Sequence, residues 1–175
     1  LHFEGSVDPA YTGGWANTFS YKNLSLSFLV SYQGGNRIRL DPSFSSSYDD
    51  FSAMPREFLD RWQMPGDELY TNVPVIIDTR TEYPGYPFTN YNYSTIRTVS
   101  GAFIRLKNAA FSYNLPGETV KKMGLNNLSV GLNASNLWLI YADKALHGQD
   151  PEFYNSGGVA LPLPQQFTLT LKVGI

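Results

Sequence analysis

The side chains of this sequence that could bind a ligand are mainly aromatic, and they gather between segments of regular hydrophobic pattern. Tyrosine and tryptophan rings can stack on sugar rings or on peptide side chains, and they can equally pack one loop against another. The candidates that we carry forward as ligand-binding residues are Trp62, Tyr86, Tyr91, Tyr93 and Tyr141, with Tyr83 and Tyr154 in the same segments. For each of them, packing of the loops is the alternative interpretation.

Groups that could perform catalysis or hold a metal ion are sparse. His2 and His147 have no second ligand at metal-binding spacing, and the sequence has no cysteine. The acidic pairs at 49–50 and 150–152 follow no EF-hand spacing, and Asp-Pro sequences commonly begin turns. No serine lies in a Gly-x-Ser-x-Gly motif. The sequence therefore predicts no enzyme, no cofactor and no metal site.

The elements between these residues alternate apolar and polar side chains, which is the pattern of β-strands. The pattern is clearest in the last segment, where every second side chain is apolar. These positions, predicted to carry membrane insertion of the terminal strand, are Phe167, Leu169, Leu171, Val173 and Ile175. The predicted strands cover approximately residues 14–21, 24–34, 103–115, 127–138 and 165–175, and Lys22 with Asn23 forms a two-residue hairpin turn.

The parity of the apolar positions changes within the segment 103–115. Ile104 and Leu106 have one parity, whereas Ala109 and Phe111 have the other. A β-bulge would shift the parity by one residue. Alternatively, Arg105 and Lys107 lie on the outer face of the strand and meet anionic lipid headgroups. The sequence leaves both interpretations open.

Composition separates the possible classes of protein. Charged residues make up 16 % of the chain, below the roughly 25 % of soluble domains, while aromatic residues reach 15 %. A net charge of −2 argues against nucleic-acid binding. The polar faces of the predicted strands carry Ser, Thr, Asn, Gln and Gly, which suits the interior of a barrel whose apolar face meets lipid. A soluble β-sandwich that binds glycans is the alternative, and its outer face would usually be charged.

The connections alternate between short turns and two long loops, at 37–102 and 139–164. Transmembrane barrels show this asymmetry, with short periplasmic turns and long extracellular loops. The sequence thus predicts an all-β fold with about five antiparallel strands of a large transmembrane β-barrel and long extracellular loops. Because five strands cannot close a barrel without exposed edges, we expect the chain to be a fragment.

Motifs along nearly the whole chain resemble the SusC/RagA family of TonB-linked outer-membrane proteins. They are Asp8-Pro9 to Gly13-Gly14, Phe19 to Asn23, Arg61-Trp62 with Pro65-Gly66-Asp67, Phe103 to Asn108, Tyr113 to Pro116, Asn136-Leu137 and Gly148 to Glu152. The final residue, Ile175, departs from the aromatic residue that commonly ends such barrels, which bears on how the barrel-assembly machinery recognises the strand.

The resemblance implies a plugged barrel of 22 strands in the bacterial outer membrane, of which this chain would supply the last five. It implies a nutrient importer for oligosaccharides or peptides, a SusD-like surface lipoprotein as partner, and energy from the TonB complex through an N-terminal part that this chain lacks. An open porin without a plug is a further alternative.

Overall fold

The computed structural model describes residues 2–41, 51, 54–76, 87–154 and 163–175. The chain forms two compact units, one made of Leu1–Ile38 with Ser100–Ile175 and the other of Arg39–Val99. Among the described residues, no helix has the length and apolar character needed to cross a membrane.

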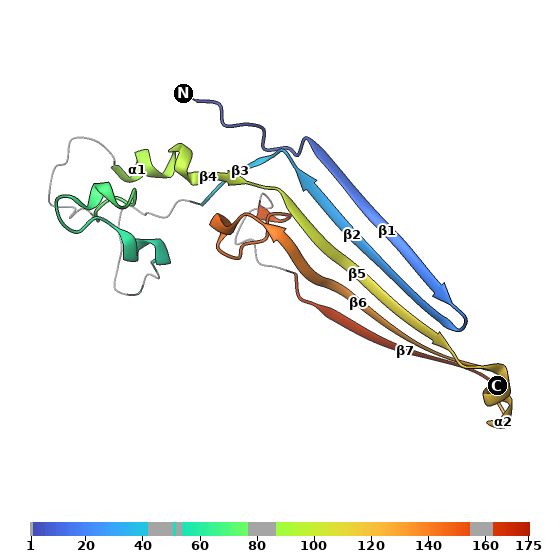
Figure 1. The fold of residues 1–175 in the computed structure, drawn as a ribbon. Helices are drawn as coiled ribbons and strands as arrows, with labels where there is room; N and C mark the ends of the chain where they lie inside the picture. Colours follow the sequence, from blue (N-terminus) through green and yellow to red (C-terminus); the bar gives the residue numbers. More distant parts are fainter. Residues whose placement is uncertain (1, 42–50, 52–53, 77–86, 155–162) are drawn as a thin grey trace. The chain divides into compact units, whose positions relative to one another are not determined.

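The first unit is a single antiparallel sheet of five long strands in the order β1-β2-β5-β6-β7 (Figure 1). The strands are β1 (Tyr11–Tyr21), β2 (Leu24–Gly34), β5 (Phe103–Asn114), β6 (Asn127–Ala142) and β7 (Gln166–Gly174). These five strands pair in the order in which they occur along the chain, as in a meander. The predicted all-β class with about five antiparallel strands is confirmed.

Some of the strand boundaries differ from the prediction. β6 runs to Ala142, four residues beyond the predicted end at 138, and β1 begins at Tyr11 instead of 14. Two short strands, β3 (Arg37–Arg39) and β4 (Thr98–Ser100), pair with each other at the two ends of the segment predicted as one long loop. These residues therefore do not belong to an irregular loop.

Short connections lie at one end of the five-stranded sheet and long ones at the other (Figure 1). Lys22, with a φ of 51°, and Asn23 form the turn between β1 and β2. The helix α2 (Gly117–Lys122) joins β5 to β6, and Gly124 ends it with a φ of 74°, as expected for a glycine in the left-handed region after a helix. The C-terminal residue lies at this same end.

A β-bulge interrupts β5 at Lys107. In the pairing with β2, Leu106 lies opposite Val30 and Asn108 lies opposite Leu29, so Lys107 has no residue opposite it. The pairing with β6 shifts between the same two residues of β5. The bulge puts Leu106 and Ala109 on the same face, which confirms that it causes the change of parity in the sequence.

The second unit is built from short helical turns around a small apolar cluster. Its elements are the 3₁₀ helices η1 (Arg56–Asp60), η2 (Asp67–Leu69) and η3 (Thr95–Arg97) and the helix α1 (Pro87–Asn92). Phe58 and Val73 are buried, and Phe88 and Tyr91 pack against them.

Candidate functional site

One face of the five-stranded sheet is apolar across all of its strands, and we call it the apolar face. The pairing register aligns one side chain from each strand into a continuous row, made of Phe19, Leu26, Phe111, Leu132 and Leu169. All five are between 42 % and 73 % exposed. Among the described residues no second sheet covers this face, as the only other sheet consists of two strands of three residues. A soluble sandwich, which would bury this row, is therefore disfavoured.

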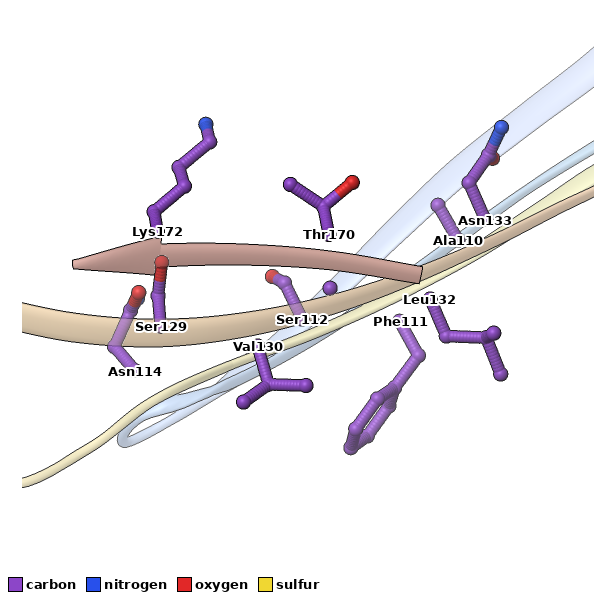
Figure 2. A pocket seen from close by; sticks show the side chains of 11 residues that line it. Ala110, Phe111, Ser112, Asn114, Ser129, Val130, Leu132, Asn133, Thr170 and Lys172 are labelled. Atoms are coloured by element: carbon purple, nitrogen blue, oxygen red, sulfur yellow. The ribbon is translucent and has the colours of Figure 1, made fainter. Parts of the chain in front are cut away.

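The opposite face, here called the polar face, carries small side chains in equally continuous rows. One of them is made of Ser20, Ser25, Ser112, Gly131 and Thr170, and the next of Thr18, Ser27, Ala110, Asn133 and Thr168. Figure 2 shows Ser112, Ser129 and Thr170 on one side of the strands and Phe111, Val130 and Leu132 on the other. A shallow hollow of about 380 Å³ lies on this face around Gly131, because glycine has no side chain to fill the space. Lys172 adds a cation at its edge.

Aromatic side chains with polar tips mark the two ends of the apolar face. At the end of the long connections it carries Tyr11, Trp15, Tyr32, Trp138 and Tyr141, each more than 40 % exposed. At the end of the short turns it carries Tyr21 and Tyr113. The rows between them hold Phe, Leu, Val and Ala, with Asn17 of β1 as the exception. Amphipathic rings of this kind suit the two interfaces of a membrane.

The distance between the two aromatic ends matches a bilayer. Tyr11 and Tyr21 are ten residues apart on β1, which corresponds to about 33 Å along the strand at roughly 3.3 Å per residue. For a strand tilted by about 40° from the barrel axis, this length corresponds to a height of about 25 Å, which is the height of the apolar band on transmembrane barrels. The apolar face thus has the dimensions of a membrane-spanning surface.

The residues predicted for the terminal strand lie on this apolar face. β7 places four of them opposite apolar partners on β6, in the pairs Phe167 with Ala134, Leu169 with Leu132, Leu171 with Val130 and Val173 with Leu128. Ile175 follows the end of the strand and is 96 % exposed. Their role in membrane insertion stays a prediction.

Three ion pairs lie where β5 is bulged. Arg105 Nη2 is 2.5 Å from Asp150 Oδ2, and Arg105 Nε is 3.2 Å from Glu152 Oε2. Lys107 Nζ is 2.6 Å from Glu152 Oε1. The side chains of Arg105 and Asp150 are 4 % and 0 % exposed. The alternative that placed Arg105 and Lys107 against lipid headgroups is therefore wrong, because both cations turn to two carboxylates within the protein.

These ion pairs were not anticipated from the sequence. Arg105 with Lys107, and Asp150 with Glu152, have the same spacing of two residues, so each pair of like charges can project from one side of an extended segment. This matching spacing is a signal that could have suggested the contact. The partners are 45 residues apart, however, and spacing alone does not show which segments meet.

Two of the aromatic candidates have structural contacts in the second unit. The Trp62 indole Nε1 donates a hydrogen bond of 2.6 Å to the backbone oxygen of Thr71. Tyr91 packs against the apolar cluster and donates through its hydroxyl to Glu57 at 3.4 Å. Both rings therefore help to shape this unit, as the packing interpretation expects.

The other candidates are placed differently. Tyr93 is 71 % exposed, and the Arg39 guanidinium lies 5.7 Å from the centre of its ring. Tyr141 belongs to the first unit, where it lies on the apolar face of β6 opposite Ile104. Tyr86 and Tyr83 lie outside the described residues, as does the acidic pair 49–50.

A buried arginine organises the electrostatics of the second unit. Arg97 donates to Glu57 Oε2 at 2.6 Å and to the backbone oxygen of Asp41, and its guanidinium carbon is 5.3 Å from the centre of the Tyr91 ring. Burial, with the nearby negative charge of Glu57, raises the pKa of the Tyr91 hydroxyl above its usual value of 10.0. Tyr91 therefore stays a hydrogen-bond donor at neutral pH.

Asp67 closes the turn that precedes η2. Its Oδ2 accepts hydrogen bonds from the backbone N–H groups of Gln63, at 2.8 Å, and Met64, at 3.0 Å. These bonds lower the pKa of the Asp67 carboxyl below its ordinary value of 3.8, because they favour the charged form. The described residues contain no group of three or more His, Cys, Asp or Glu side chains placed to hold a metal ion.

Two curated proteins are similar to this chain over most of its length. TonB-dependent receptor P26 of Formosa agariphila is 29 % identical over 97 % of the chain, and TonB-dependent receptor P3 of the same organism is 26 % identical over 85 %. The chain spans 17 % and 13 % of the length of these relatives. No protein-family model matches it. The relatives are named as receptors and not as enzymes.

Solved structures of similar fold cover 99 % of the chain. The RagAB peptide importer in its closed-closed state aligns with a TM-score of 0.69 and 22 % identity, and its open-open state with 0.65 and 23 %. The chain covers 18 % of the matched chain in each. The fold is thus that of a part of a large β-barrel, as the sequence predicted.

Proposed function

We propose, from the premise that this chain belongs to the TonB-dependent receptors of the SusC/RagA type, that it forms part of the wall of an outer-membrane nutrient importer. The observation that supports this role most strongly is the two-faced sheet. An exposed apolar face that ends in aromatic side chains at both edges suits lipid, and a polar face almost without charge suits the interior of a barrel. All backbone groups would then be paired between strands once the barrel is closed.

In this proposal the long connections lie outside the cell. β1, β5 and β7 run toward the end with the short turns, and β2 and β6 run back. Short turns lie on the periplasmic side of bacterial barrels and long loops on the outer side. The second unit, residues 39–99, would therefore be extracellular, and the connection from β6 to β7 would begin and end on the outer side.

The substrate is an oligosaccharide or a peptide, and a SusD-like lipoprotein binds at the extracellular end. Support comes from the RagAB relatives, which are named as peptide importers. Leu59, Met64, Leu69 and Tyr70 of the second unit are between 66 % and 89 % exposed, which suits contact with a partner or a substrate. The TonB complex supplies energy through parts of the receptor outside this chain, and the barrel-assembly machinery inserts the wall.

Among the aromatic candidates, Tyr93 is the best placed to contact a substrate directly. Its ring is largely exposed and keeps a cation beside it. Trp62 and Tyr91 would act indirectly, because their hydrogen bonds and packing maintain the shape of the loop. Tyr141 would anchor the wall at the outer membrane interface.

The test uses the full-length receptor in its own cells. We expect it in the outer-membrane fraction, and we expect uptake of labelled peptides or oligosaccharides to stop when TonB is deleted. A protein that stays in the soluble fraction would support the glycan-binding sandwich and contradict the proposal. Uptake that persists without TonB would identify an open porin.

A further inference from the structure

The segment 143–154, here called the strap, folds back onto the polar face of the sheet. Its first residue is Asp143. The Asp143 carboxylate accepts hydrogen bonds from the backbone N–H groups of Ser100, at 3.1 Å, and Ala145, at 3.0 Å. The 3₁₀ helix η4 (Lys144–Leu146) follows. The hydrogen bond from Ser100 thus ties the start of the strap to a distant segment of the chain.

The second attachment of the strap is the set of ion pairs with β5. Arg105 lies opposite Ser31 on β2, while its neighbours Ile104 and Leu106 lie on the apolar face, so Arg105 belongs to the polar face. Asp150 and Glu152 of the strap are held there by Arg105 and Lys107. Because Arg105 and Lys107 are two residues apart on β5, both cations project from the same side of the strand.

Burial shows that this attachment is a packed contact and not a surface encounter. Asp150 is completely buried, Leu146 is 1 % exposed and Tyr154 is 8 % exposed. Asp150 also accepts a hydrogen bond from the backbone N–H of Glu152 at 3.0 Å, which fixes the carboxylate for Arg105. Removing one partner of such a buried pair leaves a charge without compensation, which is strongly unfavourable.

We propose that the strap is a fixed constriction on the interior side of the barrel wall, and that its exposed residues, not the strands beneath, meet the substrate at this level. The placement of the strap on the polar face stands on the contacts above, whereas its contact with substrate rests on the proposed function. The strap would then limit the size of what passes along the wall. Lys144, His147 and Gly148 are the exposed residues that it presents.

The first experiment asks whether the ion pairs hold the strap. In the full-length receptor, a lysine-specific protease would cut after Lys144 only when the strap opens, that is, when it leaves the polar face and unfolds locally. We expect the wild type to resist cleavage there and Asp150→Asn to be cut roughly a hundredfold faster, because cleavage follows the population of the open form. Glu118→Gln, an exposed acidic position on α2, is the matched control and should behave as the wild type.

A charge-conserving variant guards against a change that simply prevents assembly. Lys107→Glu should open the strap, since it faces Glu152, whereas Lys107→Arg keeps the positive charge beside Glu152 and should stay resistant. Heat-modifiable migration in electrophoresis verifies that the barrel is folded in each case. Two results would overturn the proposal that the ion pairs hold the strap: folded Asp150→Asn receptor that is cleaved at the wild-type rate, or a Lys107→Arg receptor that is cleaved as fast as Lys107→Glu.

The second experiment asks where the strap lies. A single cysteine replaces Lys144 in a receptor otherwise free of cysteine, and Leu59→Cys serves as the control on an exposed loop position. We expect a small maleimide to label both sites and a bulky polymer-coupled maleimide to label only the control. Equal labelling of both sites by the bulky reagent overturns the interior location. Fractionation of the same cells tests the proposed function separately, because a receptor absent from the outer membrane fails that assay whatever the strap does.

Discussion

Substitution of Leu169 by arginine tests the assignment of the apolar face to lipid. Leu169 is the fourth of nine residues in β7, close to the middle of the strand, and it is 73 % exposed on the apolar face. An arginine facing lipid near the midplane costs about 2 to 4 kcal/mol in a transmembrane barrel. With about 1.4 kcal/mol for each factor of ten, this is roughly one and a half to three orders of magnitude in the folding equilibrium.

Two further variants on the same strand test whether the cost of an arginine depends on the face of the sheet and on the depth in the membrane. Thr170→Arg points to the polar face beside the hollow around Gly131, where it has room and meets no lipid, so we expect little change in stability. Val173→Arg lies on the apolar face near the end of the strand, where the cost falls to about 0 to 1 kcal/mol near the interface. The expected order of destabilisation is Leu169, then Val173, then Thr170.

The assay is reversible unfolding of the full-length receptor by urea in lipid vesicles, together with its amount in the outer membrane. Equal destabilisation by the Leu169 and Thr170 variants would show that the two faces do not differ in environment. A larger effect of Thr170→Arg would reverse the assignment of the faces. Either result would refute the placement of the apolar face against lipid.

Two other predictions concern the backbone and the pH dependence. Gly35 has a φ of 82°, and a Cβ added there would lie 2.6 Å from the Cβ of Ala10. Gly35→Ala should therefore lower the free energy of unfolding in urea by about 1 to 2 kcal/mol. Gly131→Ala is the control and should have little effect, because its added Cβ would have no neighbour nearer than 3.8 Å. Because the folded pKa of Asp67 lies below 3.8, its turn is stabilised above that pH and loses this contribution as the pH falls through the folded pKa. Hydrogen exchange of the two amides that donate to Asp67 should show this loss, and Asp67→Asn should make it independent of pH; protection that already fails near neutral pH would contradict it.

The faces of the sheet could be predicted from the sequence because side chains alternate along a strand whatever its neighbours are. Even the bulge leaves a trace, since Leu106 and Ala109 fall out of step by one residue. The extension of β6 left no such trace. Asn136 has a φ of 55°, which breaks the alternation, and the residues Leu137 to Ile140 that follow are all apolar. A strand without alternation cannot be told from a loop or a helix segment by periodicity.

The candidate binding residues could be predicted only as a class. Exposed and structural aromatic residues have the same type and the same irregular surroundings in sequence. Trp62 and Tyr91 differ from Tyr93 in the partners that the fold supplies, namely the Thr71 carbonyl and the Glu57 carboxylate. Such partners come from other segments of the loop, so no local pattern identifies them.

The bulge in β5 and the charges on the polar face are parts of one arrangement. Between the bulge and the short turns, the paired rows of this face hold Ser, Thr, Asn, Gln, Gly, Ala and Leu29, with Lys172 at the far end. The cations appear at the level where the regular ladder is interrupted. Arg105 and Lys107, two residues apart on β5, supply two cations for the two carboxylates Asp150 and Glu152. The charges of the strap are thus paired on the wall, and a charged pair can be buried where a lone charge could not.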